Sequence, residues 1–356
     1  MDIDYARKQH TQRGRGRPFG SVGRLWKAFG RSTWNQVLLL LLVVAGVYWF
    51  VPDPGLAISI LIFALWAASL NLLLGYGGLL SFGHALPFGY GGYAAGLVLL
   101  HFSQSLWLAL LTSVVVAGVL AILVGYVSLL RSGIYFAMLT LAFAQLGYFI
   151  AFQARSITGG DNGLTIATGP VLGLLGGSVP MNAIRNPNGF YLLTAAIVLA
   201  VFSFLVLYTD SPLGRVLAAI RENEERASGC GYNTRAVKLI TFAVSSMAAG
   251  LAGGLYAMSN LFVGLQPYWL LSGTVVIMVV LGGRSTLFGP VLGAITFLVL
   301  EHYLSQQYGH WQIIVGAIFV ACVLLFPQGL WGLVRLERVR GRRRARRKEE
   351  PIGAPE

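Results

Sequence analysis

Ten apolar segments follow one another along this chain, and they constrain its fold more than any other feature. A helix rises about 1.5 Å per residue, so about 20 apolar residues cross the hydrocarbon core of a bilayer and about 17 suffice for a straight helix. We therefore expect an all-α fold, a polytopic membrane helical bundle of about ten spans. The segments are residues 34–51, 55–75, 84–101, 105–130, 133–153, 189–208, 239–261, 268–283, 287–305 and 311–333.

The third and eighth segments are short and are interrupted by glycine or proline. An arrangement of eight full spans and two re-entrant segments therefore fits the pattern almost as well, because non-helical backbone is tolerated at membrane depth where protein surrounds it. Both arrangements have an even number of crossings. Either one places the two termini on the same side of the membrane.

The charges are concentrated at the two ends of the chain. Hydrophobic residues make up 56% of the sequence and charged residues 11%, against about 25% charged residues in soluble domains. Of the 26 Lys and Arg, eight precede residue 32 and nine follow residue 334, so the net charge of +13 belongs mainly to basic tails at 1–33 and 334–356. This distribution excludes a soluble enzyme or a DNA-binding protein. It indicates contact with anionic membrane lipid and no nucleic acid.

The loops divide the positive charges unequally between the two sides of the membrane. With ten spans, 24 of the Lys and Arg lie on the side of the tails, and only Arg155 and Arg185 lie opposite. Cytoplasmic loops are enriched in Lys and Arg, so both termini are predicted to be cytoplasmic. The 34–333 transmembrane domain then has an external loop at 154–188 and a cytoplasmic loop at 209–238.

Residues 71–96 carry eight glycines and a proline at or near membrane depth. Two interpretations remain open, tight helix packing alone or a broken segment that also lines a translocation path. Residues 281–290 resemble residues 74–83 in an initial Leu-Gly and a later Phe-Gly, which favours a transporter built from repeats.

Few polar side chains lie inside the predicted spans. Each has a structural explanation in hydrogen bonding between helices, and each is also a candidate for the translocation path. The path candidates are Asn71, Gly78, Ser81, His84, Thr140, Gln145 and Glu301.

No pattern predicts catalysis or a cofactor. The cysteines, Cys230 and Cys322, are too few and too far apart for a disulfide framework. His84 has no partner at metal-ligand spacing, and no glycine-rich loop ends in Gly-Lys-Ser or Gly-Lys-Thr. We expect no metal, no cofactor and no enzyme activity.

The loop 209–238 predicts a short amphipathic helix over 212–228. Ser211 is a typical N-cap before Pro212, and Gly229 and Gly231 provide a stop. The charged run that follows Ile220 is either a solvated face or a surface that docks into a groove on a soluble partner. The apolar stripe consists of Leu213, Val216, Leu217 and Ile220, and the expected i,i+4 ion pairs are Arg221 with Glu225 and Glu222 with Arg226.

Six stretches together resemble the permeases of ATP-binding-cassette importers for branched-chain amino acids, of the LivM type. The resemblance covers about residues 55–333. Its motifs are LNLLLGYGGLLSFGHA at 70–85, GIYFAMLTLAFAQ at 133–145, TGGDNGL at 158–164, SPLGRVLAAIRENEERA at 211–227, AVKLITFAVSSMAAGLAGGLYA at 236–257 and VLGGRSTLFGPVLGA at 280–294.

The resemblance implies import of leucine, isoleucine and valine across a bacterial inner membrane, although similar permeases import urea, short amides or other small solutes. It implies four kinds of contact: a second, LivH-type permease subunit, two cytoplasmic ATP-binding subunits, an external substrate-binding protein and membrane lipid. The loop 209–238 would couple the permease to the ATP-binding subunits. The implied coupling residues are Ser211, Gly214, Arg215, Ala218, Ala219, Arg221, Glu222, Glu224, Glu225, Gly229 and Gly231.

Two other function classes compete with this one. An ion-coupled secondary transporter needs carboxylates within the membrane, and Glu301 is the single acidic residue within or at the edge of a predicted span. An integral-membrane enzyme needs a nucleophile with its base or a metal cluster, and the sequence offers neither. The importer permease is therefore the favoured prediction.

Overall fold

The computed structural model describes residues 33–166, 187–265, 269–284, 286–307, 309–325 and 329–330. Residues 1–32 and 331–356, where the basic tails are predicted, and most of the loop 154–188 lie outside these ranges. Each of the ten apolar segments contains a helix, so their helical nature is confirmed. The elements are α3 (Thr33–Phe50), α4 (Pro54–Asn71), the π-helix η1 (Leu72–Tyr76), α5 (Ala85–His101), α6 (Leu106–Ser128), α7 (Ile134–Gln153), α8 (Arg155–Thr158), the 3-10 helix η2 (Gly160–Asn162), β1 (Leu164–Thr165), α10 (Pro187–Asp210), α11 (Pro212–Glu222), α12 (Glu224–Gly229), α13 (Thr234–Asn260), β2 (Phe262–Val263), α14 (Trp269–Gly282), α15 (Gly289–Gln307) and α16 (Trp311–Leu325).

The structure is that of a polytopic helical membrane protein. Among the described residues, five helical runs are long and apolar enough to cross a bilayer. Shorter apolar helices cover residues 37–50, 269–282 and 311–322. The five long runs are Pro54–Tyr76, Leu106–Ser128, Ile134–Gln153, Asn188–Asp210 and Thr234–Asn260.

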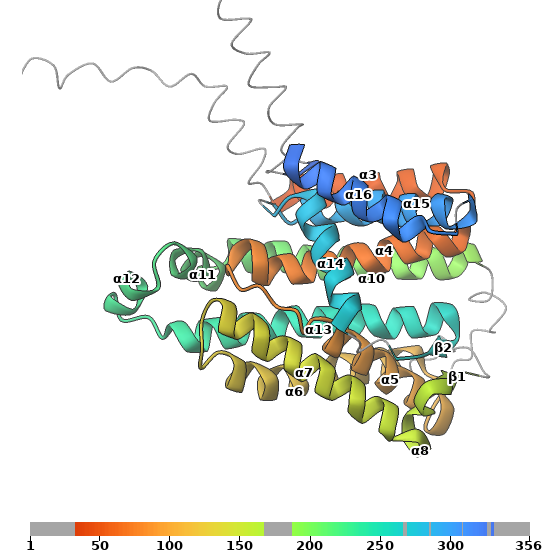
Figure 1. The fold of residues 1–356 in the computed structure, drawn as a ribbon, viewed down its shortest axis with the longest axis horizontal. Coiled ribbons are helices and arrows are strands. Elements are labelled where there is room, and N and C mark those ends of the chain that lie inside the picture. The colour runs from red at the N-terminus through yellow and green to blue at the C-terminus, as the bar shows by residue number, and fades with distance from the viewer. Residues whose placement is uncertain are drawn as a thin grey trace, which may run out of the picture.

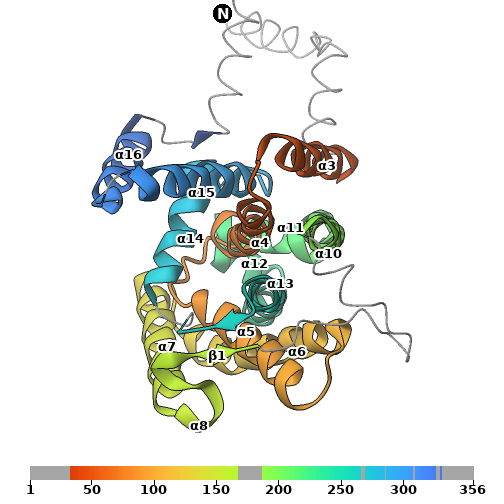
Figure 2. The same cartoon turned by 90° about the vertical axis from the view of Figure 1, so that its right-hand side faces the viewer.

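Helices α4 and α13 lie near the centre of the bundle, and Figure 2 shows α13 end-on there, with α10 end-on at the right-hand edge beside α4. Helices α5, α6 and α7 lie on one side of this centre, and α3, α15 and α16 lie on the other (Figure 2). The run Pro54–Tyr76 is almost wholly buried, and its Trp66 ring stacks on Phe88 of α5 with the centroids 4.1 Å apart. The α4 helix is therefore the core of the membrane domain.

The glycines of α5 are explained by its close approach to α13. A Cβ atom at Gly253 would collide with the backbone carbonyl of Phe88, and one at Gly91 would collide with the backbone of Gly250. Small residues let two helix backbones approach closely in a membrane protein. For residues 85–96, which belong to α5, the interpretation of the glycines as packing residues is supported.

Helix α14 runs steeply across the direction of α4, α10 and α13 in both views (Figures 1 and 2). Its 14 residues extend about 21 Å, which is less than the roughly 30 Å of a bilayer's hydrocarbon core. The described helix of the eighth apolar segment is therefore shorter than a straight full span.

The connections between the helices lie at two opposite ends of the bundle (Figure 1). One end carries α11, α12 and the connection between α6 and α7, and we refer to it as the α11 end. The other end carries α8 and a two-stranded antiparallel sheet in which Leu164 pairs with Val263 and Thr165 with Phe262. Each strand of this pair has only two residues, so the all-α fold class that the sequence predicts is confirmed.

Candidate functional site

The central helix α4 ends in an irregular segment. Helix α4 continues into the π-helix η1, where the Gly77 N–H donates to the Leu72 carbonyl at 3.2 Å and the Leu79 N–H donates to the Leu73 carbonyl at 2.9 Å. The chain then runs without regular structure to α5, through Gly78 at φ +67°. This left-handed backbone favours glycine. The segment 71–84 is thus an interrupted helix inside the protein.

A second interruption, between α14 and α15, contacts the first. The Asn71 side chain donates from Nδ2 to the Thr286 carbonyl at 2.9 Å. Gly75 lies between the Asn71 side chain and the Arg284 carbonyl, where a Cβ atom would collide with both. The two segments whose sequences resemble each other, 74–83 and 281–290, therefore lie against one another.

A buried polar cluster surrounds the first interruption, and four elements contribute to it. His84 Nε2 lies 2.9 Å from the Ser69 hydroxyl, and the Ser245 hydroxyl donates to the Ser69 carbonyl at 2.5 Å. Ser272 of α14 accepts a hydrogen bond from the Ala85 N–H at 2.8 Å. The indole of Trp66 donates to the His84 carbonyl at 3.3 Å. These contacts hold the start of α5 against α4 and α14, and they hold α13 against α4.

Sequence reasoning missed Ser69, Ser245, Ser272 and Trp66 as members of this cluster. Serine hydroxyls in helices often bond to a carbonyl of their own helix, so a lone serine in an apolar run does not indicate a contact between helices. The available signal was the recurrence of serine in three otherwise apolar segments.

Four of the seven path candidates lie at the interruptions and are buried: Asn71, Ser81, His84 and Thr140. The Thr140 hydroxyl accepts a hydrogen bond from the Phe82 N–H at 3.2 Å, which attaches α7 to the interrupted segment. The Ser81 hydroxyl accepts from the Gly83 N–H at 3.3 Å.

The other three path candidates are not buried: Gly78 lies in the first interruption itself, whereas Gln145 and Glu301 lie away from both interruptions. Gly78 is exposed beside Arg221, and Gln145 is exposed on α7. Glu301 is half-buried on α15, 12 residues after that helix begins at Gly289, which is about 18 Å along its axis.

The predicted cap of α11 is present. The Ser211 hydroxyl accepts a hydrogen bond from the Gly214 N–H at 3.2 Å, and Pro212 opens the helix. The predicted continuous helix over 212–228 is wrong, because Asn223 is extended at φ −159° and separates α11 from α12. The Asn223 side chain accepts from the Arg226 N–H at 2.8 Å and caps α12. Asparagine caps a new helix better than it continues an existing one.

The break at Asn223 also overturns the expected i,i+4 ion pairs, since Arg221 and Glu225, and likewise Glu222 and Arg226, lie on different helices. Arg221 instead donates from Nη1 to the Gly75 carbonyl. Glu224 pairs with Lys238 of α13, with Oε1 and Nζ 2.5 Å apart. The charged run therefore attaches α11 and α12 to the membrane helices.

The apolar face of α11 is turned toward its own chain. Leu217 and Ile220 are buried in a cluster with Ala227 and Val237, and Tyr76 of η1 packs against this cluster. The predicted coupling residues that are exposed are Arg215, Ala218, Ala219, Arg221, Glu222, Glu224, Glu225, Gly229 and Gly231, and the apolar side chains of Leu213 and Tyr232 are exposed beside them. A partner at this end would therefore meet a mainly polar surface with small residues, on which Leu213 is the exposed member of the apolar stripe.

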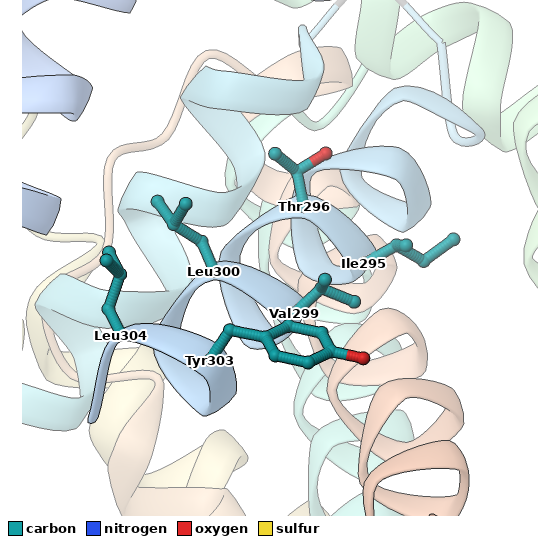
Figure 3. A pocket seen from close by; sticks show the side chains of 6 residues that line it. All are labelled: Ile295, Thr296, Val299, Leu300, Tyr303 and Leu304. Carbon is teal, nitrogen blue, oxygen red and sulfur yellow. The ribbon is translucent and has the colours of Figure 1, made fainter. Parts of the chain in front are cut away.

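A hollow on the outer face of α15 is unsuited to a zwitterionic solute. Figure 3 shows that the side chains lining it all come from this helix. They are Ile295, Thr296, Val299, Leu300, Tyr303 and Leu304. The Thr296 hydroxyl is bonded to the Leu292 carbonyl at 2.9 Å, and none of the lining residues is charged.

Residues 55–324 match the family described as the permease component of branched-chain amino acid transport systems. The chain is 28% identical, over 327 residues, to the high-affinity branched-chain amino acid transport system permease protein LivM of Escherichia coli K12, an alignment that covers 86% of this chain and 77% of LivM. It is 25% identical over 268 residues to a probable LivM of Methanocaldococcus jannaschii, with 65% of this chain and 75% of that protein covered. A LivH permease of Salmonella typhimurium is 28% identical over 149 residues, an alignment that covers 40% of this chain and 46% of that LivH.

Proposed function

The chain belongs to the family of permease components of branched-chain amino acid transport systems, and on this premise we propose that it forms half of a translocation path that cytoplasmic ATP-binding subunits drive. The family is one of membrane permeases rather than enzymes. The other half of the path would come from a second permease resembling LivH, which this chain also resembles in part. The transported solutes would be leucine, isoleucine and valine.

The observation that carries the proposal is the contact between α11 and the interrupted helix. Leu217 and Ile220 pack with Tyr76, and Arg221 bonds to Gly75, so the loop 209–238 is joined to the interruption inside the membrane domain. The opposite surface of the same loop is polar and exposed. A loop with these two surfaces suits transmission of movement from a soluble ATP-binding subunit to the membrane helices.

The distribution of charge supports a cytoplasmic location for the α11 end. The described cationic residues belong to the α6–α7 connection, to the loop 209–238 and to the second interruption, except for Arg155 in α8 at the opposite end (Figure 1). They are Arg131, Arg215, Arg221, Arg226, Arg235, Lys238 and Arg284. By the positive-inside rule the α11 end and both tails, 1–33 and 334–356, would be cytoplasmic, in the inner membrane of a bacterium.

The β1–β2 end would then receive the external substrate-binding protein. Within the membrane, the exposed amide of Gln145 lies near the middle of α7, where lipid offers no hydrogen-bonding partner. We assign this face of α7 to the second permease or to the shared path. Asn71, Ser81, His84 and Thr140 would form the part of the path at the interruptions.

Uptake by the reconstituted complex tests the proposed solute. Radiolabelled leucine is offered to proteoliposomes that contain both permeases and the ATP-binding subunits, with the binding protein added outside. Unlabelled isoleucine and valine should compete, whereas urea and short amides should not. Competition by urea or an amide without competition by valine would assign the chain to an importer of another small solute.

A further inference from the structure

The side chain of Arg221 reaches from the last turn of α11 to η1, where its Nη1 donates a hydrogen bond to the Gly75 carbonyl. Gly75 lies near the C-terminal end of the helical run Pro54–Tyr76. Carbonyls at that end of a helix lack partners within the helix and carry the negative end of its dipole. A guanidinium group is favourable there both as a donor and as a cation.

The Arg221 side chain packs closely against the backbone beside this bond. Gly78 is left-handed at φ +67°, and a Cβ atom on it would lie 3.0 Å from Cγ of Arg221. A Cβ atom on the preceding Gly77 would lie 3.5 Å from a methyl group of Leu217. Gly78 thus lets the Arg221 stem lie directly against the interrupted backbone, whereas a Cβ atom on Gly77 would make only an ordinary contact with Leu217.

The bonded carbonyl belongs to a segment that joins both interruptions. Gly75 contacts the Asn71 side chain and the Arg284 carbonyl, and Asn71 in turn donates to the Thr286 carbonyl. A displacement of Gly75 would therefore act on the second interruption as well as on the first. Its π-helical setting is rare in proteins and occurs frequently at functional sites.

We propose that Arg221 is a positioning residue that transmits movement of α11 to the two interrupted helices, rather than a residue that contacts the ATP-binding subunit. The proposal rests on the proposed function, since it assumes that α11 is moved by such a subunit. Besides the apolar packing of Leu217 and Ile220, the described part of the loop has a second charged attachment, Glu224 to Lys238, which holds α12 to the long helix α13. Arg221 is therefore the charged link between the loop and the interrupted helix.

The test compares Arg221→Ala, Arg221→Lys and Gly78→Ala with the wild-type complex in proteoliposomes. Arg235→Ala is the matched control, because Arg235 is an exposed arginine at the same end, in the first turn of α13. Three quantities are measured: retention of the ATP-binding subunits on purification, ATP hydrolysis, and leucine accumulated per ATP hydrolysed. A residue that only docks the ATP-binding subunit or only stabilises the fold would alter retention of the subunits and leave the leucine accumulated per ATP hydrolysed unchanged.

Arg221→Ala should retain the subunits and hydrolyse ATP, while leucine accumulated per ATP falls about tenfold, the size expected for loss of one charged hydrogen bond. Arg221→Lys should recover part of the loss, because an ammonium group also donates to a carbonyl. Gly78→Ala should uncouple as Arg221→Ala does, since the added methyl group crowds the Arg221 stem and strains the left-handed backbone at this position. If the Arg221→Ala protein does not accumulate in the membrane, the leucine accumulated per ATP hydrolysed by Arg221→Lys and Gly78→Ala tests the proposal instead.

Two results would overturn the proposal. One is a ratio for Arg221→Ala equal to that of Arg235→Ala. The other is loss of the ATP-binding subunits from the Arg221→Ala complex, which would make Arg221 a docking contact. Failure of the wild-type complex to accumulate leucine with ATP would instead reject the proposed function itself.

Discussion

The carboxylate of Glu224 lies 2.5 Å from the ammonium group of Lys238, and this ion pair joins α12 to α13. The Lys238 side chain is 10% exposed and the Glu224 side chain 44% exposed. Glu224→Gln should lower the free energy of unfolding by about 1 kcal/mol, since solvent screens the more exposed partner. Thermal unfolding of the purified permease measures this change.

The control for that pair is Glu225→Gln, which alters a neighbouring exposed carboxylate with no partner in the described part of the chain. The exchange Glu224→Lys with Lys238→Glu should restore most of the stability. Equal destabilisation by both single Gln variants would show that the pair contributes nothing specific.

Docking of an ATP-binding subunit is best tested at Glu225, because Glu224 is engaged by its own chain. Glu225→Lys should lower uptake several-fold and weaken retention of the ATP-binding subunits, while the permease still inserts in the membrane. Co-purification of the subunits and leucine uptake are the measurements. Unimpaired uptake would remove Glu225 from the docking surface.

Loss of the α11 cap should loosen the loop. Ser211→Ala removes the acceptor of the Gly214 N–H and should cost about 1 kcal/mol locally, which corresponds to an increase of about fivefold in amide hydrogen exchange within α11. Ser228→Ala, at an exposed serine of α12, should leave the exchange of α11 unchanged. An unchanged rate for Ser211→Ala would indicate that tertiary packing alone holds α11.

The close packing of α5 on α13 predicts a strong effect at Gly253. Gly253→Ala introduces a methyl group against the Phe88 carbonyl and should destabilise the protein by about 3 kcal/mol. Gly229→Ala is the matched control, because a Cβ atom there meets nothing within 4 Å. The yield of folded permease after size-exclusion chromatography compares the two variants. Similar yields would contradict the packing that the structure describes.

Much of the fold follows from the sequence because apolar runs and capping residues act locally. The apolar segments predicted the positions of the helices, and Ser211 with Pro212 predicted the start of α11. The division at Asn223 was missed, although asparagine followed by two glutamates is itself typical of a helix N-terminus. The charged run had been interpreted as one continuous helical face.

The contacts between distant segments could not be predicted in the same way. The Arg221 side chain could equally have pointed to solvent, and its bond to Gly75 depends on how α11 folds back against η1. The bond from Asn71 to Thr286 joins residues 215 positions apart. Only the weak similarity of 74–83 to 281–290 hinted that these segments are related. The serines around His84 needed the helix packing before they could be recognised.

The central claim is that this permease is moved by ATP hydrolysis in partner subunits and not by an ion gradient. The most direct test is leucine accumulation in proteoliposomes with an imposed proton or sodium gradient, with ATP and the ATP-binding subunits present or absent. We predict accumulation only when ATP, both permeases, the ATP-binding subunits and the binding protein are present, whatever the gradient. Accumulation by this chain alone, driven by an ion gradient without ATP, would contradict the account.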